Sequence, residues 1–300
     1  MTITSEWNPP QWLRELDEGP DELLWNLQGM DRGWEEYPSG MDFLEPNSPN
    51  HDWKAFQTQL YVDALGDALG LGSDSPLEVL DAACGIGRFL LPLAQAGHRI
   101  LGVDACRPSL EAAARHLESA ASSKPALTER VQLRWDDINT TELPEAGFDL
   151  VLAMELLCYL PEPEKTAQRL ANSLRPGGRL ILSVEAWPGA LLSARSSLAP
   201  AELARACLRR ELSVPGDHWV HPMEADELAA ILEGVGLELL QLDGIHFFAD
   251  GPLADQVVLK QLGDPNYNRE LLGLEKALRT DPVFHGLSRA WLAVAQRKDR

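Results

Sequence analysis

The sequence contains no cysteine or histidine pattern at metal-binding or redox spacing. Its four cysteines, Cys84, Cys106, Cys158 and Cys207, lie far apart, and no Cys-x-x-Cys motif is present. Structural zinc sites and disulfide frameworks both need closer or paired cysteines. We therefore expect reduced thiols, no metal and a cytoplasmic location.

Long apolar runs and an excess of basic residues are also missing. No run reaches the roughly 18 residues that a membrane span needs, and the first residues lack the charged and apolar regions of a signal peptide. The formal net charge is −20, with 26 Lys and Arg against 46 Asp and Glu. Phosphate backbones and anionic membrane surfaces attract clusters of Lys and Arg, so this balance argues against nucleic acid and membranes as partners.

One apolar run, over residues 77–80, is followed by closely spaced small residues. The run is typical of a buried parallel strand, and the small residues after Asp81 predict a tight turn into a helix. The first N–H groups of such a helix attract electron-rich ligand atoms. The dinucleotide-binding spacing G-x-G-x-x-G fails at two of its three positions, where Ala83 and Arg88 stand. A Gly-Lys-Ser/Thr sequence for a triphosphate is also missing.

This stretch resembles motif I of the class I S-adenosylmethionine (SAM)-dependent methyltransferases, D-x-G-x-G-x-G. Asp81, Gly85 and Gly87 match the motif, and Ala83 stands where its first glycine is expected. The methyl group of Ala83 is tolerated there if the backbone φ stays negative. The resemblance implies that Asp81, Ala83, Cys84, Gly85 and Gly87 line a SAM site.

The second predicted strand, residues 99–104, ends in an acid. Asp104 follows Gly85 by 19 positions (104 minus 85), where an acid in a doubly wound sheet can accept hydrogen bonds from both ribose hydroxyls. Ala105 and Cys106 follow, at a place where these methyltransferases commonly have a small residue. The resemblance implies that Ala105 and Cys106 lie against the adenine.

The third predicted strand, residues 131–134, leads into a segment that resembles the family's Gly-Asp-Ala step. In the family, the acid of this step accepts a hydrogen bond from the adenine amino group. Asp136 and Asp137 are the two acids here, and Ile138 follows them in the expected cofactor-binding segment. The alignment favours Asp136, and Trp135 replaces the usual glycine. Residues 148–155 then resemble the family's F-D-x-V strand, whose Met154 carbonyl would face the amino group of the methionine moiety.

The expected fold is α/β, a doubly wound, seven-stranded Rossmann-like sheet whose last strand is antiparallel and lies between strands five and six. The L-R-P-G-G-x-L pattern at residues 174–180 predicts a Pro-Gly-Gly turn before the fifth strand. Residues 51–300 would form the methyltransferase domain, with helical cap insertions at about 187–222 and 246–288. Inserts at these connections cover the carboxyl ends of the strands, where an acceptor would bind.

Residues 1–50 are acidic and rich in tryptophan, and we expect them to form an extension or lid. Their aromatic residues either pack on the domain or cover the cofactor, in which case Tyr37 contacts the sulfonium, whose positive charge an aromatic face favours. The expected acceptor pocket contains four aromatic residues, Trp34, Tyr159, Trp187 and Trp219.

Three residues are candidate bases: His221, Glu155 and His246. His221 is equally well explained as a histidine at an interface, and His246 as part of the core. Tyr159 stands where the family often has a histidine, so no base follows from that position.

The predicted activity is methyl transfer from SAM to an oxygen or nitrogen atom of a small-molecule acceptor, possibly a carboxylate. A base is needed only if the acceptor is protonated at the working pH. Two alternatives stay open: a methyltransferase that acts on a peptide or protein end, and a SAM-binding partner subunit without turnover. The sequence carries no signal for an oligomeric state.

Overall fold

The computed structural model describes residues 43–44, 46–48, 50–69, 75–122, 124–193, 198–213, 219–248 and 250–298. The predicted contacts of Trp34 and Tyr37, and with them most of the N-terminal extension, lie outside the described residues. The side chain of Trp219 also lies outside them.

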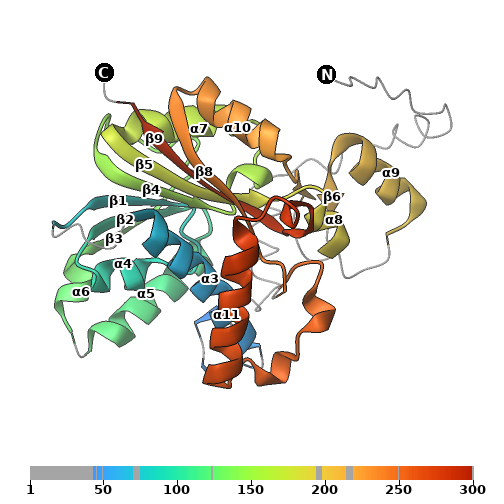
Figure 1. Ribbon diagram of the computed structural model, residues 1–300. Coiled ribbons are helices and arrows are strands. Elements are labelled where there is room, and N and C mark those ends of the chain that lie inside the picture. Colours follow the sequence, from blue (N-terminus) through green and yellow to red (C-terminus); the bar gives the residue numbers. More distant parts are fainter. Residues whose placement is uncertain are drawn as a thin grey trace.

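Seven strands form one sheet in the order β3-β2-β1-β4-β5-β9-β8 (Figure 1). Strands β1 to β5 are parallel, and β9 runs antiparallel to both of its neighbours, β5 and β8. This order confirms the predicted doubly wound sheet with an antiparallel last strand. The bounds are β1 Glu78–Ala82, β2 Arg99–Asp104, β3 Val131–Trp135, β4 Phe148–Met154, β5 Leu174–Glu185, β8 Leu237–Ile245 and β9 Ala290–Arg297.

Helices cover both faces of the sheet because alternate strand residues point to opposite sides. Leu80 and Val151 belong to one core cluster, with residues of α7 and α10, whereas Val79 and Leu150 belong to the other, with residues of α3, α4 and α5. The bounds are α3 His51–Leu69, α4 Leu90–Gln95, α5 Arg107–Ala121, α6 Ala126–Glu129, α7 Pro163–Ser173 and α10 Ala225–Gly234.

The predicted Pro-Gly-Gly turn lies inside β5 instead of before it. Gly177 has a φ of 74°, and the register between β4 and β5 shifts between Phe148 and Leu150. The chain therefore bends within one continuous strand that begins at Leu174.

The two predicted insertions contain short elements at the end of the sheet where the parallel strands finish. Residues 187–222 carry α8 Gly189–Ser193, α9 Pro200–Arg209, and a two-stranded sheet of β6 Leu212–Ser213 and β7 Trp219–Val220, which the sequence patterns did not predict. Residues 246–288 carry η4 Ala254–Gln256, η5 Leu259–Gln261, α11 Pro265–Arg279 and η6 His285–Leu287. Helix α11 lies beside α3 (Figure 1).

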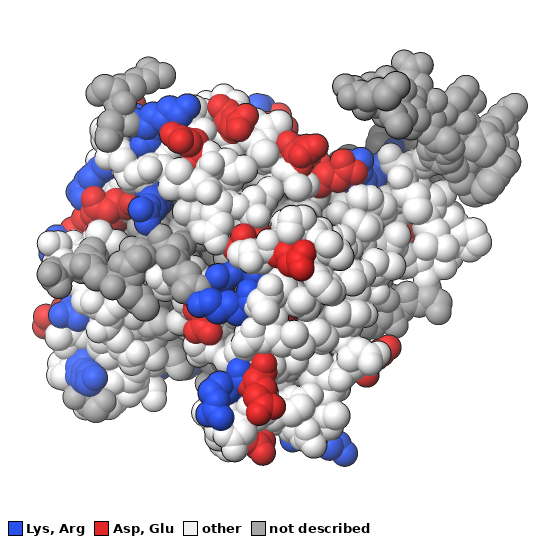
Figure 2. Space-filling view, viewed as in Figure 1, with Lys and Arg blue, Asp and Glu red and all other residues white. Residues whose placement is uncertain are grey.

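Charged side chains of both signs are interspersed over the face drawn in Figure 2. On this face the described Lys and Arg residues form no continuous basic patch. Within the described ranges, no helix is long and apolar enough to cross a membrane.

Candidate functional site

The loop after β1 has an unusual backbone that opens a space above it. Gly85 and Gly87 have positive φ angles of 52° and 83°, and a Cβ atom on Gly85 would meet no atom within 4 Å. A Cβ on Gly87 would lie 2.9 Å from Leu90 Cδ1 and 3.0 Å from Ala113 Cβ. Gly85 therefore exposes backbone to a ligand, whereas Gly87 lets the chain pack closely against α4 and α5.

The expected negative φ of Ala83 is wrong. Ala83 has a φ of 59°, in the left-handed region that glycine adopts without a steric penalty. The loop backbone follows the path that a glycine would take at this position. Ala83 is therefore strained, because its Cβ lies too close to the following carbonyl oxygen.

Asp104, at the end of β2, fastens this loop. Its Oδ2 accepts a hydrogen bond from Gly85 N at 2.7 Å, and its Oδ1 accepts one from Cys106 N at 2.8 Å. A carboxylate has about four acceptor positions, and two of those of Asp104 bind the backbone of Gly85 and Cys106. The carboxylate is thus held in place beside the Gly85 backbone.

The segment after β3 lies next to Asp104. Asp136 N donates to Asp104 O at 3.1 Å, and Trp135 Nε1 donates to Ala105 O at 2.8 Å. Asp137 Oδ1 accepts from both Asn139 nitrogens, Asn139 N and Nδ2. Both acids therefore take part in this turn, since Asp136 Oδ1 also accepts a hydrogen bond, from Asp137 N at 2.9 Å.

Other predicted cofactor residues surround this edge of the sheet. The side chains of Cys84, Cys106, Ile138 and Met154 are buried. Cys106 is the N-cap residue of α5, and Met154 is the last residue of β4.

Asp81 is buried at the end of β1, with 1% of its surface exposed, and its Oδ2 has no hydrogen-bond partner. The pKa of Asp81 is raised to about 8, because burial and the nearby Asp104 carboxylate raise it more than Arg88 lowers it. A buried acceptor without a partner is costly in a native structure. An ammonium group fits this acceptor.

A second group of polar residues gathers around Glu155, which follows β4 and has a φ of 53°. Tyr61 of α3 donates its hydroxyl proton to Glu155 Oε1 at 2.8 Å. Burial of Glu155 would raise its pKa, but the charges of Arg88 and Arg289 outweigh burial, and the pKa is lowered to about 2. Burial and the Glu155 charge raise the pKa of Tyr61, so its hydroxyl stays protonated.

His246, directly after β8, completes this group. Its side chain is 2% exposed, its ring centroid lies 4.8 Å from that of Tyr61, and neither ring nitrogen has a hydrogen-bond partner. The pKa of His246 is lowered to about 3. Burial is the largest cause, the charges of Arg289 and Arg88 also lower the pKa, and Glu155 opposes the shift. The imidazole is therefore neutral at neutral pH and has two unused ring nitrogens.

Arg289 joins the sheet to the second insertion. Its guanidinium pairs with Glu185 at the end of β5, Nη2 to Oε1 at 2.5 Å, and with Asp250 of the insertion. Burial would lower the pKa of Arg289, but Glu185, Glu155 and Tyr159 raise it above its ordinary value. Tyr159 therefore also lies close to this group.

His221 and Trp187 have other surroundings. The His221 Nε2 lies 2.7 Å from Glu227 Oε1 of α10, and the His221 side chain is 26% exposed. Trp187 is half-buried against the core, and its backbone N–H donates to Met223 O at 2.9 Å. The structure thus gathers Glu155 and His246, and gives His221 a carboxylate partner of its own.

Sequence patterns missed Tyr61, Arg88, Glu185 and Arg289. Arg88 directly follows Gly87 of the motif, and Glu185 directly follows the apolar part of β5, so each had a local signal. Tyr61 and Arg289 had none, because their partners Glu155 and Glu185 lie 94 and 104 positions away.

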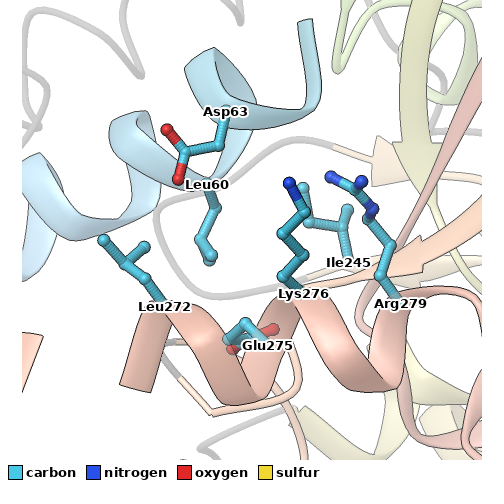
Figure 3. Close-up of a pocket in the computed structure, with 7 residues that line it drawn as sticks. All are labelled: Leu60, Asp63, Ile245, Leu272, Glu275, Lys276 and Arg279. Atoms are coloured by element: carbon cyan, nitrogen blue, oxygen red, sulfur yellow. The ribbon is translucent and has the colours of Figure 1, made fainter. Parts of the chain in front are cut away.

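A small hollow between α3 and α11 is lined by residues of both helices and by Ile245 of β8 (Figure 3). Glu275, one of its lining residues, accepts hydrogen bonds from the backbone N–H groups of Phe247 and Phe248, at 3.1 and 2.8 Å. Arg279, on the same helix, pairs with Asp243 of β8 at 3.1 Å. Glu275 and Arg279, which line the hollow, therefore hold the backbone after His246 and strand β8 against α11.

A comparison with known protein families gives one match. A family model described as a methyltransferase domain matches residues 53–242. The chain belongs to this methyltransferase family. The matched range includes β1 to β5, the motif I loop and the whole first insertion.

Curated relatives agree with this membership. A ubiquinone biosynthesis O-methyltransferase of Sinorhizobium fredii is 28% identical over 227 residues, 73% of this methyltransferase and 84% of the relative. One of Coxiella burnetii is 27% identical over 193 residues, 63% and 74% of the two chains. The chain is a SAM-dependent methyltransferase, which confirms the predicted enzyme class and cofactor.

Solved structures show the same fold. The magnesium protoporphyrin IX methyltransferase of Synechocystis with bound SAM has a TM-score of 0.54 at 17% identity, over 92% of this chain and 99% of that one. The [4+2]-cyclase SpnF has a TM-score of 0.51 at 20% identity, over 80% and 81% of the two chains. Since the fold also carries a cyclase, the family match and the site residues have to identify the chemistry.

Proposed function

We propose that this methyltransferase transfers the methyl group of SAM to a hydroxyl oxygen of a small-molecule acceptor. The observation that carries the proposal is His246, a buried neutral imidazole with two unpartnered nitrogens beside Glu155. A hydroxyl oxygen must lose its proton as it attacks the methyl carbon, and a neutral imidazole within hydrogen-bond reach can take that proton. A carboxylate acceptor would need no such group.

The chain's own residues hold the reactants. When bound, SAM supplies a methyl group already activated on a positive sulfonium. We expect Asp104 and the Gly85 backbone, which are hydrogen-bonded to each other, to hold the ribose, and Asp136, whose N–H donates to Asp104 O, to contact the adenine. Alignment of this kind contributes up to roughly 7–11 kcal/mol to the lowering of the barrier.

Two features support a small hydroxyl compound as the acceptor. The curated relatives are named O-methyltransferases. The Arg88 and Arg289 charges, which lower the pKa of His246, would also lower the pKa of a hydroxyl bound beside it.

The test is a panel of acceptors with tritiated methyl-SAM: catechol and simple phenols, aromatic carboxylates, primary amines and a short peptide. We expect label in the phenols. His246→Asn should lower turnover by about 10²- to 10⁴-fold while the affinity for S-adenosylhomocysteine stays within about twofold. His116→Asn, on α5, is the matched control.

Three outcomes contradict the proposal. Label in amines, carboxylates or peptide alone would assign another acceptor. Tight S-adenosylhomocysteine binding with no product from any acceptor would support a partner subunit without turnover. Wild-type turnover in His246→Asn would remove the histidine from the chemistry.

A further inference from the structure

Glu155 has a backbone conformation that a residue with a Cβ atom rarely adopts. It directly follows β4, and its φ of 53° lies in the left-handed region. Strain of this kind persists only where the surrounding structure holds the residue in place, and it gathers at functional sites. The contacts that hold Glu155 therefore bear on how its carboxylate is used.

Hydrogen bonds among three residues close a ring around Glu155. The Glu155 N–H donates to Ser183 Oγ of β5 at 2.9 Å, and the Tyr61 hydroxyl donates to Glu155 Oε1 at 2.8 Å. A side-chain hydrogen bond joins Ser183 to Tyr61. Since the single hydroxyl proton of Tyr61 goes to Glu155, the Ser183 hydroxyl is the donor of this third bond. Tyr61 and Ser183 are both fully buried, so the ring is shielded from water.

The same tyrosine contacts His246 through its aromatic ring. The ring centroids of Tyr61 and His246 lie 4.8 Å apart, with an interplanar angle of 68°. Phe89 packs on the Tyr61 ring from another direction, with centroids 6.0 Å apart and an angle of 86°. Edge-to-face contacts of this kind favour one orientation of each ring. Tyr61 thus holds Glu155 through its hydroxyl and His246 through its ring.

The methyl transfer proposed above moves a positive charge onto His246. The acceptor oxygen forms a bond to the methyl carbon, the carbon–sulfur bond breaks with its electron pair left on sulfur, and the hydroxyl proton passes to an imidazole nitrogen. A buried imidazolium is costly unless an opposite charge lies near it. The charges of Arg88, Arg289 and Lys54 oppose the imidazolium. The Glu155 carboxylate favours it.

We propose that Tyr61 and Ser183 are positioning residues which hold the Glu155 carboxylate near His246, where it balances the charge that the imidazole gains with the acceptor's proton. This inference rests on the proposed function, because it assigns the same proton to His246. It also sets a limit on the acceptors that depend on the ring of hydrogen bonds. A hydroxyl that is protonated at the working pH needs the ring, whereas an acceptor that is already ionised does not.

The test compares two acceptors that differ in hydroxyl acidity. Phenol keeps its proton at pH 8.5, whereas 4-nitrophenol is ionised there and needs no base. Tyr61→Phe keeps the ring contact with His246 but removes the hydroxyl, and should lower phenol turnover by about 10- to 100-fold, as expected for a lost hydrogen bond to a charged group. Ser183→Ala removes a bond between neutral groups and should lower it by about 3- to 10-fold. Turnover of 4-nitrophenol should stay within about twofold of wild type in both variants.

Control variants separate this role from a loss of packing. Tyr267→Phe on α11 and Ser173→Ala on α7 each remove a hydroxyl outside the ring and should change turnover of neither acceptor. Tyr61→Phe should add no further loss to Glu155→Gln, because Tyr61 acts through that carboxylate. Calorimetric affinity for S-adenosylhomocysteine within about twofold of wild type reports a folded cofactor site in each variant. If Tyr61→Phe fails to fold, Ser183→Ala, alone and with Glu155→Gln, carries the test.

Three results would overturn the positioning role while the proposed function stands, since wild-type protein labels phenol in each. Equal losses with phenol and 4-nitrophenol would make the ring of hydrogen bonds a support of the fold alone. A loss of S-adenosylhomocysteine affinity equal to the loss of turnover would make Tyr61 a contact of the cofactor. A further loss on adding Tyr61→Phe to Glu155→Gln would show that Tyr61 does not act through Glu155. Wild-type protein that labels neither phenol would instead overturn the proposed function, and this inference with it.

Discussion

Ala83 has the backbone angle of a glycine, and this strain can be measured. A left-handed alanine costs roughly 1–2 kcal/mol, whereas glycine adopts the same angle freely. Because glycine also loses more entropy on folding, we expect Ala83→Gly to raise the free energy of unfolding by about 0.5–1 kcal/mol in urea. Ala82→Gly, one residue earlier in β1, is the matched control and should lower it by about 1 kcal/mol. Equal losses in both variants would show that Ala83 is unstrained.

Asp81 connects stability to pH. Its pKa is about 8 in the folded protein and about 3.9 in an unfolded chain, so the folded state holds the proton more tightly between these values. The contribution of Asp81 to stability therefore falls as pH rises from about 4 to about 8, on the order of a few kcal/mol in total. Asp81→Asn removes this slope.

The measurement is urea unfolding of wild type and Asp81→Asn at pH 5.5 and pH 8. We expect the variant to gain stability relative to wild type at the higher pH and to bind S-adenosylhomocysteine more weakly at both. An identical stability difference at the two pH values would show that Asp81 is ionised in the folded protein throughout the range.

At the scale of elements, the strands that carry the cofactor site follow from local patterns. Asp81, Asp104 and Met154 each lie at or near the carboxyl end of an apolar run, and parallel strands bring such ends to one edge. The polar group around Glu155 could not be predicted in the same way. Tyr61 lies on a helix whose apolar spacing only indicates burial, and its pairing with Glu155 depends on how α3 packs on the sheet.

Helix α11 supplies a test of how an element positions a side chain. Glu275 is 2% exposed and accepts the N–H groups of Phe247 and Phe248, next to His246 with its φ of 63°. Glu275→Gln replaces one acceptor oxygen by a donor that faces these N–H groups, which should lower the free energy of unfolding by about 1–3 kcal/mol.

If Glu275 positions His246, turnover should fall further than S-adenosylhomocysteine affinity, because Glu275 holds the backbone next to His246, whereas Asp104 holds the motif I loop. Glu270→Gln, an exposed acid on the same helix, should change neither. A loss of cofactor affinity equal to the loss of turnover in Glu275→Gln would instead indicate general unfolding.

At the scale of the whole molecule, Arg289 links three parts of the chain through charge. It pairs with Glu185 of β5 and Asp250 of the second insertion, and its charge lowers the pKa of His246 and Glu155. Removing it takes this cation away from two shielded carboxylates, so Arg289→Gln should lower the free energy of unfolding by about 3–5 kcal/mol. Adding Glu185→Gln should recover part of this loss, because one of the two carboxylates that lost the cation is then uncharged, and a double-mutant cycle in urea measures that coupling.

The same variant tests whether this charge also governs the chemistry. Without Arg289, the pKa of His246 rises, because one of the cations that opposed its protonation is absent. If His246 accepts the acceptor's proton, the acid limb of the methyl-transfer rate should move to higher pH in Arg289→Gln and in the double variant. Arg297→Gln, at the far end of β9, should leave the limb in place. If the acid limb of the pH–rate profile stays in place in all three variants, Arg289 contributes to stability alone. Its ion pairs then join the second insertion to the sheet without changing the pKa of His246.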